Sequence, residues 1–222
     1  MIKMTVRALA GAVLALLPLT AASSARAAEN DVPVRYASLH DGVETLPLAA
    51  ESRAGYQRTS FKHWTDADHN GCSTRAEVLI AESRERPEIG PKCTVLTGRW
   101  YSYYDGVTVT NPKGLDIDHM VPLAEAWDSG ASQWSAARRE AYANDLGADR
   151  SLVAVTAKTN RSKADQDPAT WLPPLADARC TYAADWVSTK LRWSLTVDRA
   201  ERDALRRLAA GCGHTHVEYQ PV

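Results

Sequence analysis

The stretch Leu115–Leu123 reads LDIDHMVPL, and the fold of the chain is organised around it. Apolar residues alternate with the carboxylates of Asp116 and Asp118 along a segment that ends at His119, which is the pattern of a half-buried strand. Pro122 cannot continue a ladder of strand hydrogen bonds, so it predicts that the strand ends near the histidine. Adjacent residues on a regular strand point to opposite faces. Asp118 and His119 therefore reach one site only if the strand bends or ends between them.

A second stretch, Thr159–Lys163, places a carboxamide beside two cations and supplies the other half of a candidate metal site. Asp118 and Asn160 offer side-chain oxygens, and hard oxygen ligands suit Mg²⁺ or Mn²⁺ better than Zn²⁺. His119 has an ordinary pKa of about 6.5 and can accept a proton from water near neutral pH, so we expect it to be the general base. The ion would polarise a scissile phosphate and stabilise charge on the leaving oxygen.

Basic side chains gather near these stretches, although the chain as a whole is not basic. Residues 1–27 hold three basic residues and no acids, so the remainder has 23 Lys and Arg against 27 Asp and Glu, a formal charge of about −4. Support for nucleic-acid binding must therefore be local. We expect Arg161 and Lys163 to hold non-bridging phosphate oxygens. A local basic stripe would comprise Arg138, Arg139, Arg150, Lys158, Arg161 and Lys163, although a solvated helix face explains Arg138 and Arg139 equally well.

A longer pattern joins the two stretches. It comprises Asp116–Leu123, Trp127, Tyr142–Asp145, Leu152–Val155, Asn160–Lys163 and Trp171–Pro173. This pattern resembles the HNH endonuclease superfamily, and in particular a secreted branch related to the C-terminal domain of the GmrSD restriction endonuclease, over roughly residues 60–195. The resemblance implies a ββα-metal nuclease core in which Asp118 and Asn160 bind the metal and His119 is the general base. It also implies products with 5′-phosphate and 3′-hydroxyl ends.

Two further residues take supporting roles in this interpretation, Asp116 and Ser151. Many members of the superfamily carry an asparagine just before the second strand, and that residue orients the histidine or the loop rather than binding metal. Ser151 stands at this place, directly before Leu152. A hydroxyl would therefore take over the orienting role here.

Each piece of the pattern also has a purely structural explanation. An Asp-His pair at the end of a strand is usually an ordinary loop pair, and Asn160 alone would more often cap a helix. Lys163 alone would be a solvated charge. The nuclease interpretation rests on the order and spacing of all the pieces together.

The N-terminal segment and the cysteines predict export. Residues 1–27 carry basic residues, an apolar run and then small residues, which is the pattern of a secretory signal peptide. The apolar run is shorter than the about 20 residues of a membrane span, so we expect no membrane anchor. An even number of cysteines in an exported chain predicts two disulfides. Of the three possible connectivities we favour the sequence-local one, Cys72 with Cys93 and Cys180 with Cys212, over a zinc site, for which C-x-x-C spacing is missing.

The remaining pattern predicts a single, mostly helical domain. Residues 28–60 read as an irregular or weakly helical lead-in without identifiable chemistry, and residues 61–222 as the nuclease domain with its core at 114–175. Helices are expected at 76–86, 132–146, 182–193 and 198–210, and a second strand at 150–156. Residues 95–110 predict a β-hairpin that turns at Asp105-Gly106. Its aromatic residues, Trp100, Tyr101, Tyr103 and Tyr104, can stack on bases, but packing within the sheet is the commoner role.

The segment Asp66–Glu77 has the spacing of an EF-hand loop. Oxygen-bearing side chains alternate along it, a glycine occupies the sharp turn, and an acid stands at the twelfth position. The candidate ligands of a structural Ca²⁺ are Asp66, Asp68, Asn70 and Glu77. The other explanation is a capping box, Thr74–Glu77, that opens the next helix.

These observations predict a secreted, monomeric, metal-dependent HNH-type endonuclease of α+β architecture that hydrolyses phosphodiester bonds of nucleic acid, with DNA favoured. No helix-turn-helix or zinc-finger pattern is visible, so we expect low sequence specificity. The competing hypothesis is a non-catalytic secreted binding module that keeps the fold and is stabilised by Ca²⁺. A peptidase or esterase is disfavoured because the chain lacks the Gly-x-Ser-x-Gly and His-Glu-x-x-His motifs.

Overall fold

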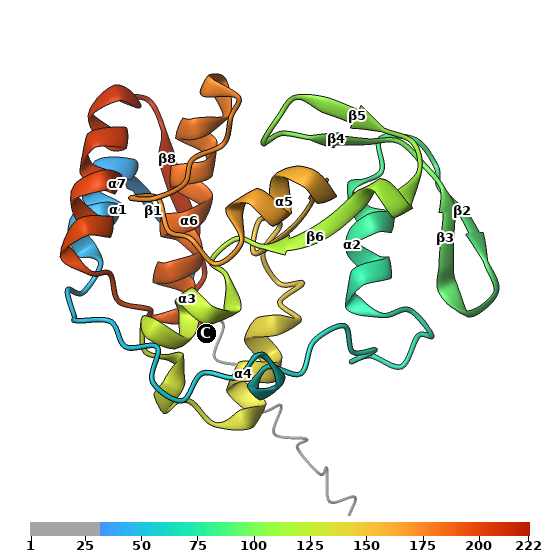
Figure 1. The fold of residues 1–222 in the computed structure, drawn as a ribbon, viewed down its shortest axis with the longest axis horizontal. Coiled ribbons are helices and arrows are strands. Elements are labelled where there is room, and N and C mark those ends of the chain that lie inside the picture. Colours follow the sequence, from blue (N-terminus) through green and yellow to red (C-terminus); the bar gives the residue numbers. More distant parts are fainter. Residues whose placement is uncertain (1–31) are drawn as a thin grey trace, which may run out of the picture. The chain divides into compact units, whose positions relative to one another are not determined.

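The computed structural model describes residues 32–222, which form one compact unit. The expected signal peptide, residues 1–27, lies outside the described residues. Within 32–222, helices α1 to α7 accompany four two-stranded antiparallel sheets (Figure 1), which confirms the α+β class. None of these described helices is both long and apolar enough to cross a membrane.

The central element is the antiparallel pair of β6 (Leu115–His119) and β7 (Leu152–Thr156), followed directly by α5 (Ala157–Lys163). Alternation decides the faces of this pair. Leu115 and Ile117 belong to one buried apolar cluster, whereas Val153 and Val155 of β7 belong to the main core on the other side. The two strands and the helix form the ββα unit that the resemblance implied.

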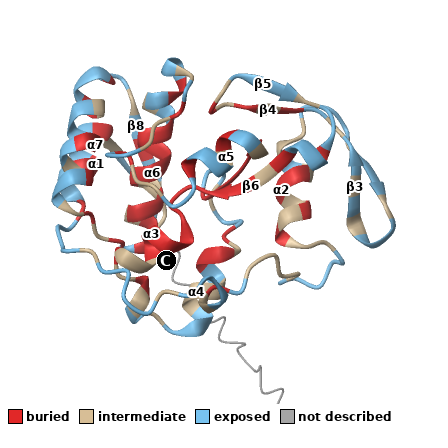
Figure 2. Cartoon of the chain, viewed as in Figure 1, coloured by how far each residue is buried: buried red, intermediate tan, exposed pale blue. Residues whose placement is uncertain are grey.

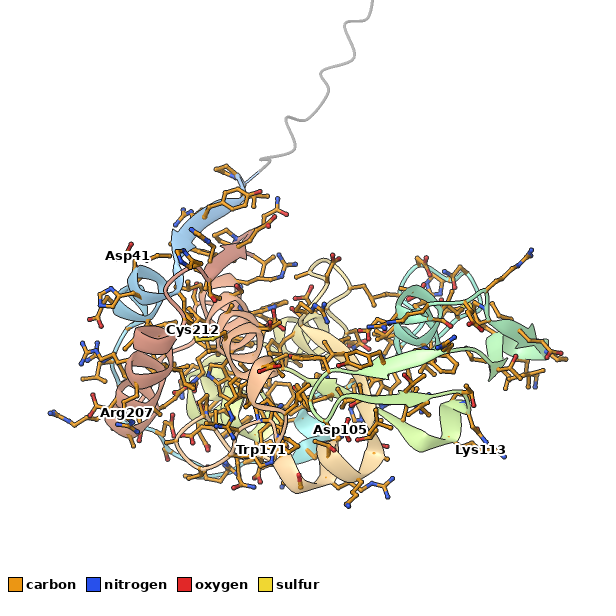
Figure 3. All side chains as sticks on the ribbon, turned by 90° about the horizontal axis from the view of Figure 1, so that it is seen from above. Asp41, Asp105, Lys113, Trp171, Arg207 and Cys212 are labelled. Atoms are coloured by element: carbon orange, nitrogen blue, oxygen red, sulfur yellow. A yellow bond between two sulfur atoms is a disulfide. The ribbon has the colours of Figure 1, made fainter. Side chains whose placement is uncertain are left out.

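The turn of a neighbouring hairpin holds the beginning of α5. Strand β4 (Trp100–Ser102) pairs with β5 (Val107–Val109), and Gly106 in the turn between them has a φ of +74°, a conformation that glycine adopts without strain. Asp105 in this turn, labelled in Figure 3, accepts a 2.6 Å hydrogen bond from the Thr159 hydroxyl. The predicted hairpin is confirmed, but its first strand is shorter than expected, because β3 (Thr94–Thr97) turns back to pair with β2 (Glu88–Gly90).

Most of the core lies against α6 (Arg179–Trp193), which contacts α7 (Arg199–Gly211), α1 (Leu39–Thr45) and β8 (His216–Tyr219). Figure 2 shows buried residues concentrated on α3, α6 and β6. The lead-in is more regular than the sequence predicts, since β1 (Arg35–Ser38) pairs with β8 and α1 packs on α6 and α7. The strand that pairs with β1 is β8, at the other end of the chain, so the local sequence pattern of the lead-in does not predict this pairing.

The remaining helices begin at side-chain caps or at Pro122. Ser73 caps α2 (Thr74–Glu82) and Ser135 caps α4 (Ala136–Ala143), each by accepting a backbone N–H. Helix α3 (Leu123–Asp128) follows Pro122. Helices α2 and α4 are shorter than the periodicity predicts. Short 3₁₀ turns lie at Arg58–Ser60, Pro91–Cys93, Pro112–Gly114, Ala131–Gln133 and Ala176–Ala178.

The aromatic residues of the hairpin are used mainly in packing. Trp100 and Tyr104 are fully buried, and the Trp100 indole donates a 2.7 Å hydrogen bond to the carbonyl of Leu79. The Tyr103 hydroxyl donates to Asp185. The hairpin therefore stabilises the fold through its aromatic residues, the commoner of the two roles expected from the sequence.

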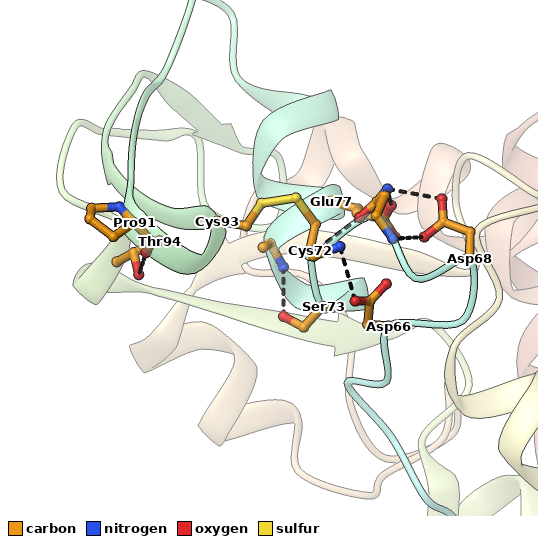
Figure 4. The surroundings of a disulfide bond; sticks show 11 residues. Asp66, Asp68, Cys72, Ser73, Glu77, Pro91, Cys93 and Thr94 are labelled. Atoms are coloured by element: carbon orange, nitrogen blue, oxygen red, sulfur yellow. Dashed lines mark hydrogen bonds between the residues drawn. A yellow bond between two sulfur atoms is a disulfide. The ribbon is translucent and has the colours of Figure 1, made fainter.

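Both predicted disulfides are present with the favoured connectivity. Cys72–Cys93 links the segment before α2 to the turn between β2 and β3 (Figure 4), and Cys180–Cys212 links the beginning of α6 to the end of α7. No free cysteine remains among the described residues. Cross-links of this kind are typical of proteins that fold outside the reducing cytosol.

Three glutamates meet around one buried ammonium group beneath the lead-in. Carboxylate oxygens of Glu51, Glu125 and Glu201 lie within 4.8 Å of one another. The Lys190 ammonium donates to Glu125 and Glu201 at 2.8 and 2.7 Å. This ammonium already supplies positive charge to the cluster, so we assign it to charge balance rather than to a metal ion.

We expect the stability of the protein to fall between about pH 5 and pH 8 because of Glu51. Burial, followed by the charge of Glu125, raises the pKa of the Glu51 carboxyl from 4.5 to about 8. The folded chain therefore keeps a proton that the unfolded chain has lost, and unfolding becomes easier as the pH rises. The Glu51→Gln variant, which mimics the protonated acid, should show a flatter profile of unfolding free energy when urea unfolding is measured across this range. Glu88→Gln, on the exposed strand β2, is the control and should follow the wild type; a Glu51→Gln profile as steep as the wild-type profile would contradict the assignment.

Candidate functional site

One surface cleft contains the predicted general base and both predicted metal ligands. It is lined by the end of β6, the beginning of α3, α5 and part of the lead-in, and the lining side chains important here are Asp118, His119, Asn160, Arg161, Tyr56 and Arg58. Strand β6 ends at His119. Because the strand ends there, Asp118 and His119 both line the same cleft although they are neighbours in the sequence.

The Asp118 carboxylate uses one oxygen inside the protein. Its Oδ2 accepts a 2.6 Å hydrogen bond from the Tyr104 hydroxyl and another of 2.6 Å from the Lys163 ammonium. Within residues 32–222, Oδ1 has no hydrogen-bond partner, and Asp118 lines the cleft. Burial raises the pKa of this carboxyl, while the charge of Lys163 opposes that rise. One oxygen is thus fixed, and the other is left for a ligand in the cleft.

Lys163 does not take the position expected from the sequence. Its side chain is fully buried, and its ammonium donates to Asp118 and to the backbone carbonyls of His119 and Met120, at 2.6, 3.0 and 2.9 Å. All three N–H donors of the ammonium are therefore used inside the protein. The expected contact between Lys163 and a phosphate does not fit this placement, and we correct it: Lys163 fastens α5 to the end of β6.

The His119 ring is held in one orientation. Its Nε2 lies 2.9 Å from the carbonyl oxygen of Ala143, and a carbonyl can only accept, so Nε2 carries the proton. The ring also lies against Trp64 and Tyr142, with centroids 5.3 and 6.4 Å away. Burial lowers the pKa of His119 to about 3. The imidazole is therefore neutral at physiological pH, with the lone pair on Nδ1.

Asp116 orients the two cleft residues of α5. Its Oδ2 accepts from the Asn160 amide nitrogen at 3.3 Å and from Arg161 Nε at 3.2 Å, and its Oδ1 accepts from the second guanidinium nitrogen at 3.4 Å. Because the amide nitrogen of Asn160 faces Asp116, the amide oxygen is turned elsewhere. The amide oxygen of Asn160 can therefore bind a ligand in the cleft. The charge of Arg161 is partly neutralised by the Asp116 carboxylate.

Ser151 acts on the loop rather than on the histidine ring. Its hydroxyl donates to Asp145 at 2.8 Å, and its carbonyl accepts from the backbone of Met120 at 3.0 Å. Asp145 is itself held by Arg192 and by the Trp193 indole. Through these bonds Ser151 fixes the turn that follows His119.

The family model for the C-terminal domain of GmrSD restriction endonucleases matches residues 75–208, more than half of the chain. The chain belongs to this family. The region matched by the GmrSD C-terminal domain family includes β6, β7, α5 and most of the cleft residues, whereas Tyr56 and Arg58 lie before it.

A curated relative of this GmrSD-family chain supports its location. A protein named "Uncharacterized secreted protein" from Arthroderma benhamiae is 38% identical over 175 residues, which cover 79% of this chain and 83% of the relative. No solved structure gives a significant match. Together with the two disulfides, this likeness identifies the GmrSD-family chain as a secreted protein.

The residues of the cleft fit a hard divalent cation. A carboxylate oxygen of Asp118 and the amide oxygen of Asn160 are left without protein partners among the described residues, and both side chains line the cleft. Oxygen ligands of this kind are those preferred by Mg²⁺ and Mn²⁺. Lys163 and Tyr104 hold the carboxylate through its other oxygen, so it does not need to reorganise on binding.

The candidate Ca²⁺ ligands of the segment Asp66–Glu77 are hydrogen-bonded within their own loop. In the EF-hand-like loop the Asn70 amide donates to Asp68 and Glu77 at 2.9 and 2.8 Å, and the Gly71 N–H donates to Asp66 (Figure 4). Among the described residues, these acids do not form a group of three close carboxylates. Binding of Ca²⁺ there stays a prediction.

The basic stripe is not continuous in this GmrSD-family structure. Arg138 stacks on Trp134 and donates to the Trp193 carbonyl, while Arg139 donates to the carbonyls of Ser60 and Ala131. These arginines bind the protein itself. The sequence does not predict that Arg58 lines the cleft. The lead-in contains no motif, and Arg58 lies some sixty residues before the strand that ends at this cleft.

Proposed function

We propose that this protein is a secreted endonuclease that hydrolyses phosphodiester bonds of nucleic acid, with DNA the favoured substrate, and that it requires Mg²⁺ or Mn²⁺. One observation carries the proposal. The neutral His119 ring, with its lone pair on Nδ1, lines the same cleft as the unpaired oxygen of Asp118. Membership of a restriction-endonuclease family supports the reaction class.

In this proposal Asp118 and Asn160 hold the metal ion and His119 activates water. When bound, the ion polarises the phosphate and stabilises charge on the leaving oxygen. His119 Nδ1 accepts a proton from water as the water oxygen attacks phosphorus. The bond to the 3′ oxygen breaks, and that oxygen leaves with the electron pair and takes up a proton from solvent. The products have 5′-phosphate and 3′-hydroxyl ends.

The other polar residues of the site position the reacting groups. The Ala143 carbonyl keeps the proton on Nε2, so that the basic nitrogen is always the same one. Lys163 fixes both the Asp118 carboxylate and the backbone around His119. Asp116 keeps the Asn160 amide in one orientation. Such fixed arrangements lower the cost of reorganisation during the reaction.

We expect the mature protein to nick plasmid DNA, to lose this activity in EDTA and to recover it with Mg²⁺ or Mn²⁺.

The Asn160→Ala variant should bind Mn²⁺ at least about tenfold more weakly in calorimetric titration, because a ligand oxygen is lost. Lys158→Ala, an exposed residue of the same helix, is the matched control and should bind as the wild type does. Single-stranded DNA and RNA tested in parallel would define the substrate.

Two results would contradict the proposal. Cleavage that persists unchanged in EDTA would remove the metal, and the absence of cleavage on every nucleic acid with every cation would leave a non-catalytic secreted domain. If Asn160→Ala bound Mn²⁺ with wild-type affinity, the assignment of Asn160 as a metal ligand would be wrong. The proposed reaction class would not be affected by that result.

A further inference from the structure

Arg58 differs from the other cations around the cleft because its guanidinium has no carboxylate partner. Arg161 is paired with Asp116, and Lys163 is buried against Asp118. Arg58 is exposed and lines the cleft from the lead-in, and within residues 32–222 it forms no ion pair. Its charge is therefore free to meet an anion.

The backbone that carries Arg58 is held firmly, although the side chain is free. It begins a 3₁₀ turn, and the Ser60 carbonyl at the end of that turn accepts a 3.2 Å hydrogen bond from Arg139. Phe61, the next residue, is buried in the main core. Earlier in the same segment Arg53 pairs with Asp128 and with Asp165. The position from which the Arg58 side chain extends is thus fixed by the protein.

Arg58 lines the same cleft as the proposed general base, His119, and the proposed metal ligands, Asp118 and Asn160. Tyr56, from the same segment of the lead-in, lines this cleft as well. A phosphate that faces the His119 ring in this cleft would therefore be near Arg58.

We propose that Arg58 binds a non-bridging oxygen of the scissile phosphodiester, the role that the sequence suggested for Lys163. This inference rests on the proposed function and adds to it a substrate contact from outside the family match. The cations Arg161 and Lys163 are already paired with the carboxylates of Asp116 and Asp118, so an anionic substrate needs a cation beyond the metal. A guanidinium suits this role because its planar donors match two phosphate oxygens at once.

Binding of a fluorescein-labelled DNA duplex in EDTA tests the contact without cleavage. Arg58→Ala and Arg58→Gln should bind the duplex roughly 10- to 100-fold more weakly, the loss typical of one charge-assisted hydrogen-bonded contact. The slope of the logarithm of affinity against the logarithm of salt concentration should fall by about one. Arg58→Lys should recover the salt slope but only part of the affinity, since lysine keeps the charge and loses the planar donors.

A measurement of kcat/KM and a control substitution at a distant arginine complete the test. With Mg²⁺ present, Arg58→Ala should lower kcat/KM at least about tenfold without changing the melting temperature, because the side chain is exposed. Arg207→Ala is the matched control: Arg207 is exposed on α7 (Figure 3) and lies outside the cleft, so its removal should leave binding and kcat/KM at wild-type values.

The outcomes separate this inference from the proposed function. Wild-type affinity and kcat/KM in Arg58→Ala would overturn it, as would an equal loss in Arg207→Ala. Binding that depends on Arg58 in a protein that cleaves nothing would overturn the proposed function and keep the contact. A wild-type protein that binds no duplex in EDTA and cleaves no nucleic acid with any of the cations would overturn both.

Discussion

Replacing His119 by alanine should lower the rate of plasmid cleavage by about 10²- to 10⁴-fold, the range that a positioned general base contributes. The reason is geometric. The proton on Nε2 is committed to the Ala143 carbonyl, so Nδ1 is the basic atom that the ring offers to the cleft. The measurement is the initial rate of nicking at saturating Mg²⁺. Binding of Mn²⁺ should be retained, because the imidazole is not one of the assigned ligands.

The variant needs a control for folding, since His119 is buried against Trp64 and Tyr142. His119→Gln keeps more of the volume, and its urea unfolding curve shows whether the domain is intact. His40→Ala, an exposed histidine on α1, should cleave at the wild-type rate. Nicking by a folded His119→Ala protein at the wild-type rate would remove this residue from the mechanism.

Replacing Lys163 by methionine should destabilise the protein by about 3–5 kcal/mol, the usual cost of leaving one member of a buried ion pair without its partner. The lysine is fully buried, and its removal leaves the Asp118 carboxylate with only the Tyr104 hydroxyl among its present side-chain partners. The backbone carbonyls of His119 and Met120 lose a donor as well. Urea unfolding monitored by tryptophan fluorescence measures the loss.

A second variant and a control identify the source of this loss. Adding Asp118→Asn to Lys163→Met should restore part of the stability, because the uncompensated charge is then absent. Lys158→Met, on the same helix but exposed, should change the unfolding free energy by less than about 0.5 kcal/mol. If Lys163→Met weakened DNA binding while the unfolding curve stayed unchanged, Lys163 would be a phosphate ligand and its structural role would be wrong.

The sequence predicts the position of Lys163 along the chain but not the direction of its side chain. The resemblance to a ββα unit implied a helix after the second strand, and Lys163 is the last residue of that helix. Spacing alone does not tell whether a lysine on such a helix points to the cleft or into the core. The outcome depends on whether Asp118 and two backbone carbonyls lie close enough to replace the water lost on burial, and only the packed structure shows that they do.

The sequence by itself predicted the β6–β7–α5 unit through its resemblance to a known family, the disulfide pairing through the nearness of the cysteines along the chain, and candidate roles for Asp118, His119 and Asn160 through the atoms that their side chains carry. All of these predictions rest on the order, spacing and chemistry of residues along the chain. The tertiary structure decided the tautomer of His119, the burial of Lys163 and the presence of Arg58 in the cleft. Those properties depend on solvent exposure and on partners far away in the chain, and both arise only when the segments pack together.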